Sequence, residues 1–112
     1  MNKNKAMNLV SAICNEKSTG CRSLNKTDIA RELLSLASVP QNAEIQEIPL
    51  DWNNQAEILF LLPNDNSYYS LFAGLGTDGN FYFELSIVGT LHNGYFNFFD
   101  AAKFLDIDYF LK

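Results

Sequence analysis

The sequence predicts a single α+β domain: one or two N-terminal helices, an antiparallel sheet of three to five strands, and a short C-terminal helix packed on that sheet. Three observations predict this class. Apolar residues recur at helical spacing early in the 112-residue chain. After Pro40 they alternate as in strands, between clusters of turn-forming residues. With 47% hydrophobic residues, the chain can bury a core. The domain is expected to span residues 1–112, with 1–5 disordered.

One or two helices are expected in the N-terminal part of the chain. Over residues 4–15, apolar side chains stand at positions i, i+3, i+4 and i+7. Over residues 26–37 the pattern is clearer, because Asn25 can cap the helix and Asp28 lies in its first turn. Pro40 follows the end of this helix. Its buried stripe is expected to be Ile29, Leu33, Leu36 and Ala37.

Two short strands are expected next. Residues 44–48 resemble an edge strand, because Pro49 ends the segment and proline cannot donate to a sheet ladder. Residues 57–62 form a short apolar run whose length suits a buried strand.

The strongest β signal is a hairpin that pairs residues 67–75 with residues 80–88. A three-residue loop ending at Gly79 sets Leu75 opposite Phe81, so that both apolar sets share the core face. The opposite face then carries Tyr68, Phe72, Tyr82 and Glu84. Either the helices cover this face as a second core layer, or it is an interface.

The C-terminal segment is expected to return to helix. Residues 89–94 are expected to form a turn, and 95–98 a short strand. A helix over residues 99–105 can be capped by Asn97 and has Asp100 in its first turn.

The charge is distributed unevenly along the chain. Residues 1–31 hold six basic and two acidic residues, whereas Glu32 to Ala102 hold nine acidic residues and no Lys or Arg. A negative field of this extent speeds association with a basic protein and repels nucleic acid phosphate. We therefore expect a basic protein partner and no direct nucleic-acid binding.

Three motifs suggest chemistry but have simpler explanations. Residues 74–79 spell G-x-G-x-x-G, but a strand pattern follows where a dinucleotide site needs a helix. Residues 27–33 resemble the first helix of a helix-turn-helix, yet the second would fall on acidic residues 41–48. His92, the one histidine, lies in a turn-like context without a nucleophile in a recognisable elbow. We expect no enzymatic activity.

The cysteines and the N-terminus favour a cytoplasmic protein. Cys14 and Cys21 are expected to be reduced thiols, and with one histidine they do not make a convincing zinc site. We expect no metal and no cofactor. The apolar part of residues 6–14 is short, no small-x-small cleavage site follows it, and no run is long enough to span a membrane.

These features favour a cytosolic inhibitor of one basic protein, foremost an immunity protein or antitoxin that neutralises a nuclease-type toxin. Alternatives are a phage-type DNA mimic or anti-defence protein, and a small regulatory or transcription-associated domain. Carboxylates would complement the cationic cleft of a nuclease, and aromatic side chains would anchor the complex. The partner-binding residues are expected to be Asp51, Trp52, Glu57, Asp65, Tyr68, Asp78, Tyr82 and Glu84.

Overall fold

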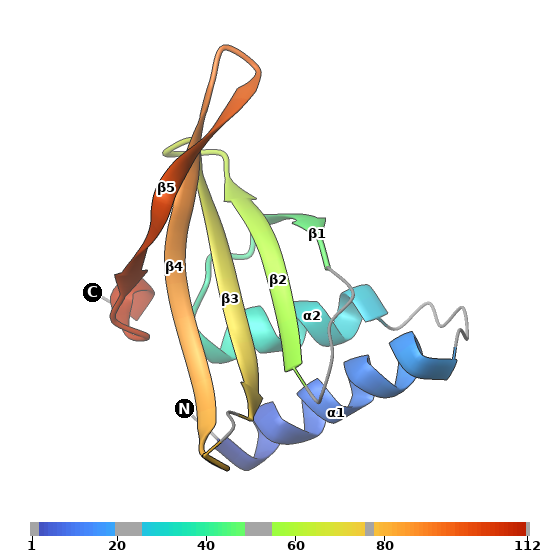
Figure 1. Ribbon diagram of the computed structural model, residues 1–112. Helices are drawn as coiled ribbons and strands as arrows, with labels where there is room; N and C mark the ends of the chain where they lie inside the picture. Colours follow the sequence, from blue (N-terminus) through green and yellow to red (C-terminus); the bar gives the residue numbers. More distant parts are fainter. Residues whose placement is uncertain (1–2, 20–25, 49–54, 76–77, 112) are drawn as a thin grey trace.

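The computed structural model is α+β, with two helices, a five-stranded antiparallel sheet and a C-terminal 3₁₀ turn (Figure 1). It describes residues 3–19, 26–48, 55–75 and 78–111. The elements are α1 (Lys3–Thr19), α2 (Lys26–Leu36), β1 (Glu44–Glu47), β2 (Gln55–Leu62), β3 (Ser67–Leu75), β4 (Phe81–His92), β5 (Tyr95–Leu105) and η1 (Tyr109–Leu111).

Both predicted helices are present. α1 begins inside the stretch 1–5 that we expected to be disordered, and it is longer than the predicted 4–15. α2 ends in a Schellman motif, in which Ser38 has a left-handed φ of 58°. The Val39 amide donates to the Leu34 carbonyl at 3.0 Å, and the Ser38 amide donates to the Ser35 carbonyl at 2.9 Å. This motif turns the chain away before Pro40, and β1 follows.

The predicted hairpin and its register are confirmed. The strands run in the order β1-β2-β3-β4-β5, and Leu75 lies opposite Phe81 as expected. Gly79 has a φ of 81°, the left-handed conformation that the predicted loop requires at its last position. Residues 76 and 77 of that loop lie outside the described residues. The apolar alternation therefore sets the pairing of the two longest predicted strands.

The predicted C-terminal helix over residues 99–105 is wrong. This segment continues β5, which pairs with β4 up to the Leu85–Leu105 pair, and the helical turn comes later as η1. The turn predicted over 89–94 is also misplaced, because Gly89 lies inside β4. The reversal is the two-residue Asn93–Gly94 turn, where both φ angles are positive. In Figure 1 this hairpin extends past the ends of the other strands.

Both helices pack on one face of the sheet, which we call the inner face. The buried core joins helix residues such as Val10 and Leu33 to alternate residues of β2, β3 and β4, among them Phe60, Leu71 and Leu85. In Figure 1, α2 runs behind the strands and α1 crosses near their lower ends. None of the described helices is long and apolar enough to cross a membrane. The other side of the sheet, the outer face, has no described helix over it.

Tyr69 is buried at the end of the inner face that lies near the β2–β3 turn. Its ring stacks on Phe60 at 5.3 Å and meets Phe110 of η1 at 5.5 Å. Its hydroxyl donates to the Asp65 carboxylate at 2.9 Å. Burial first, and then this hydrogen bond and the charge of Asp65, raise the pKa of Tyr69 well above its ordinary value of 10.0.

This shift predicts a loss of stability in alkali. The folded protein keeps the Tyr69 phenol protonated to a higher pH than the unfolded chain does, so the free energy of unfolding falls as pH rises above 10.0. Urea unfolding at pH 8 and pH 11 measures the fall, which Tyr69→Phe should reduce. Tyr95→Phe, at an exposed position, should leave the fall unchanged. An equal fall in Tyr69→Phe and in the unmodified protein would contradict this assignment.

Candidate protein-binding face

The outer face is built from strand residues that lie in rows across the sheet. One row runs Glu57–Phe72–Glu84, so two carboxylates stand on either side of a half-buried ring. The next row toward the β3–β4 turn contains Gly74 and Tyr82. The register thus brings together three of the predicted site residues, Glu57, Tyr82 and Glu84.

β1 adds two carboxylates that the predicted site did not include. Glu47 lies opposite Leu59 of β2, which in turn lies opposite Ser70 of β3. Glu44 lies opposite Leu61, which in turn lies opposite Tyr68. Both glutamates are therefore on the outer face. We call Glu44, Glu47, Glu57 and Glu84 the acidic face. Three of the four are exposed, and Glu57, which is half-buried, accepts a hydrogen bond of 2.7 Å from the Ser70 hydroxyl.

The described strands β1 to β4 place no basic side chain among these carboxylates. Strands β1 to β4 fall inside the stretch from Glu32 to Ala102, which contains no Lys or Arg. Lys103 of β5 lies opposite Ile87, on the inner face. Arg31 of α2 is directed elsewhere, since it donates to the Ala43 carbonyl. Within the part of the chain that the structure describes, the strands therefore bring a single sign of charge to the acidic face.

Tyr68 separates the acidic face from an aromatic cluster on β5. The ring of Tyr68 lies 4.7 Å from that of Phe96 and 5.5 Å from that of Phe98, and the side chain is only 5% exposed. Burial, followed by the charges of Glu47 and Glu57, raises the pKa of Tyr68. The rings of β5, not the helices, cover Tyr68, so this predicted site residue is largely withdrawn from the surface.

Tyr82 and Asp78 form a second aromatic–acidic pair at the β3–β4 turn. The Tyr82 hydroxyl donates to the Asp78 carboxylate at 2.8 Å, and the Asn80 amide donates to the same carboxylate at 3.0 Å. The Asn80 backbone bond and then the Tyr82 bond lower the pKa of Asp78. Hydrogen bonding to Asp78 raises the pKa of Tyr82. Tyr82 is 37% exposed, so its ring is partly accessible from solvent.

The remaining predicted site residues do not join this group. Asp65 lies in the β2–β3 turn, at the opposite end of β3 from Asp78, and accepts the Tyr69 hydroxyl. Asp51 and Trp52 lie outside the described residues. The structure therefore gathers Glu57, Asp78, Tyr82 and Glu84 and separates Asp65 from them.

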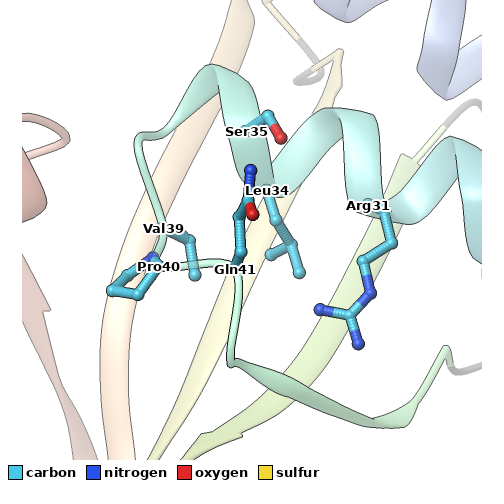
Figure 2. A pocket seen from close by; sticks show the side chains of 6 residues that line it. All are labelled: Arg31, Leu34, Ser35, Val39, Pro40 and Gln41. Carbon is cyan, nitrogen blue, oxygen red and sulfur yellow. The ribbon is translucent and has the colours of Figure 1, made fainter.

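A small pocket lies at the C-terminal end of α2, where Arg31, Leu34, Ser35, Val39, Pro40 and Gln41 line about 260 Å³ (Figure 2). Ligand pockets typically enclose about 300–1,000 Å³. Its one charged side chain, Arg31, is already engaged by the Ala43 carbonyl. The pocket is therefore smaller than a typical ligand site, and its charged side chain is already hydrogen-bonded within the protein.

The three sequence motifs that suggested chemistry lie in turns, helices and strands of ordinary structure. In the G-x-G-x-x-G segment, Gly74 lies in β3 and strand β4 follows, so no helix receives a phosphate. Residues 41–48 hold strand β1 where a recognition helix would have to lie. His92 is exposed at the end of β4, opposite Tyr95. Within the described ranges, no group of three His, Cys, Asp or Glu could hold a metal ion.

No protein-family model, curated protein or solved structure matches this chain.

Proposed function

We propose that this chain is a protein inhibitor that binds one basic protein through the acidic face, foremost an immunity protein or antitoxin against a nuclease-type toxin. One observation carries the proposal: four carboxylates share a sheet face that has no described helix over it and to which β1–β4 bring no cation. Such a face complements the cationic cleft with which a nuclease holds phosphate.

Burial and hydrogen bonding support a binding role for this face. Tyr82 is held by Asp78 and stands beside Glu84, which lies two residues along the same strand. An aromatic side chain fixed at the rim of a charged surface loses little conformational entropy on binding. Glu57 is similarly held by Ser70. The face therefore offers both steering charge and ordered contacts.

A DNA mimic or anti-defence protein is the second candidate, since the same carboxylates could occupy the nucleic-acid channel of a host protein. The two candidates differ in what they displace. A DNA mimic competes with nucleic acid for the target, whereas an immunity protein can also block a neighbouring surface. Competition between this chain and labelled DNA for the target separates them.

The test is inhibition of a panel of purified nuclease toxin domains, read as cleavage of a labelled substrate. We expect one domain to be inhibited at equimolar protein, with affinity that falls as salt rises. The double variant Glu47→Gln, Glu84→Gln should slow association with that domain by about 3- to 10-fold, because these charges steer the encounter.

A matched control removes two carboxylates elsewhere. Glu32→Gln, Asp108→Asn changes the net charge equally but touches α2 and the C-terminal turn. This control should bind nearly as fast as the unmodified protein. Equal slowing by both double variants would show that net charge alone matters and would count against the acidic face. Affinity indifferent to salt would count against the charge argument altogether.

A further inference from the structure

β5 exposes an apolar surface that the proposed inhibitor function does not use. Phe96, Phe98 and Phe104 are 41%, 62% and 72% exposed. All three lie on the outer face, since Phe96 and Phe98 contact Tyr68 and Phe104 lies opposite Ser86, itself opposite Ser70. At about 200 Å² for each ring, they leave roughly 350 Å² of aromatic surface in water. The largest apolar patch on a typical monomer covers about 300–600 Å² and is often functional, so this surface is a candidate interaction site.

β5 is also an edge strand. Its eleven residues pair with β4 on one side, and no described strand pairs with its other side. An exposed edge presents a row of amides and carbonyls that can pair with another strand. The aromatic surface and the open backbone edge thus coincide on one element.

The charge around β5 suits a second copy of this chain. β5 carries one acid and one base, Asp100 and Lys103, so it is locally neutral although the chain carries a net charge of −5. Neighbouring strands lie about 4.8 Å apart. Two copies joined at β5 would hold the carboxylates of β1 and β2 roughly 30 Å or more from their counterparts, well beyond the Debye length of about 8 Å.

We infer that β5 pairs antiparallel with β5 of a second copy, giving a two-fold dimer with a continuous ten-stranded sheet. A two-fold axis perpendicular to the sheet sets residues of the same face opposite one another. With Ala101 on the axis, Phe98 of each copy faces Phe104 of the other. Shifting the axis to Asp100 would set the two Asp100 carboxylates opposite each other, which is unfavourable.

The irregular middle of β5 leaves two regular segments for this pairing. The register with β4 shifts between Phe98 and Lys103, on either side of the proposed axis. The aromatic pairs would lie where β5 is regular, and small side chains, Ala101 and Ala102, would occupy the centre. The exposed aromatic surface of roughly 350 Å² is less than half of the roughly 800 Å² per partner of a standard complex, so we expect a weak dimer of micromolar affinity.

Sedimentation equilibrium of the full chain, from low micromolar to near-millimolar concentration, tests the inference. The unmodified protein should show a monomer–dimer equilibrium. Phe104→Glu and Phe98→Lys should each weaken it by tenfold or more. Combined in one chain they should restore it, because the introduced lysine of each copy then faces the introduced glutamate of the other.

Two controls locate the interface. Tyr95→Glu replaces an equally exposed ring of β5, 76% exposed, outside the proposed overlap, and it should leave the dimer intact. The double variant Glu47→Gln, Glu84→Gln should also leave the dimer intact. Failure of the dimer proposal can therefore be distinguished from failure of the proposed binding through the acidic face. Circular dichroism checks that Phe98→Lys, which removes a contact with Tyr68, still folds.

Several results would overturn the inference. A protein that stays monomeric at every concentration would refute the pairing of two copies. The open edge of β5 would then be available only to a strand of another protein. A dimer that both single variants leave intact would place the interface elsewhere. Failure of the combined variant to recover association, in a chain that folds, would refute the antiparallel register.

Discussion

Replacing Phe60 by alanine is expected to lower the free energy of unfolding by about 3–5 kcal/mol. Phe60 is fully buried on the inner face, stacked on Tyr69 at 5.3 Å and 6.5 Å from the ring of Phe110. The substitution removes the contact that joins β2, β3 and η1, and the surrounding backbone can close the resulting cavity only in part. For a domain of this size the loss is a large fraction of the total stability.

Urea unfolding followed by far-UV circular dichroism measures this loss. Tyr95→Ala serves as control, because Tyr95 is 76% exposed at the tip of the β4–β5 hairpin, and we expect it to change stability by no more than about 0.5 kcal/mol. Equal costs at the two positions would contradict the assignment of the inner face as the core.

Local sequence signals predicted the elements whose own residues determine them. α2 has its periodic stripe and a proline after its end, and the β3–β4 hairpin has two alternating runs with Gly79 where the turn needs a left-handed residue. In both cases the decisive contacts lie close in sequence, so periodicity and turn chemistry agree with the fold.

The C-terminal segment shows where local signals fail. Ala101, Ala102 and Lys103 favour helix, and Asp100 suits a helix start. In the structure this stretch instead extends a ladder with β4, which runs on to His92 and offers an unpaired edge. Tertiary pairing overrides local propensity here. Asn93–Gly94 between apolar runs was the signal that could have revealed the hairpin.

The acidic face could be predicted only in part, for a similar reason. The run of acids without a cation is visible in the sequence, but which of them share a face depends on strand register. Glu57 and Glu84 follow from the β2–β3–β4 pairing, whereas Glu44 and Glu47 reach the same face through β1, whose register with β2 shifts after Ile45. A one-residue shift moves side chains to the other face, and short edge strands give little sequence signal for it.

The sheet thus separates two kinds of surface. β1 lies at one edge, beside the carboxylates, and β5 lies at the other, with its aromatic rings. Tyr68 lies between them, near the charges of Glu47 and Glu57 and under the rings of Phe96 and Phe98. Charge steers partners over distance and apolar area holds them at contact. If both proposals hold, this separation would let one small domain bind a basic partner and its own copy independently.

Replacing Gly89 by alanine is expected to cost about 3 kcal/mol, because there is no space for a side chain between β4 and β5. A Cβ at Gly89 would overlap the Asn97 carbonyl oxygen and would lie 3.0 Å from the Phe98 Cα. Both are backbone atoms, so β5 itself would have to move. Gly89 also stands between Tyr68 and Phe98 in the sheet, and its lack of a side chain lets their rings meet.

Gly94, in the same hairpin, provides the matched comparison. It has a φ of 81° and open space around its Cα, so Gly94→Ala should cost only the left-handed strain of about 1–2 kcal/mol. Asparagine tolerates that conformation but has the same Cβ, so Gly94→Asn should recover part of the loss while Gly89→Asn should not. Thermal unfolding of the four variants separates the two causes. Recovery by asparagine at Gly89 would show that backbone conformation, not the approach of β5, requires glycine there.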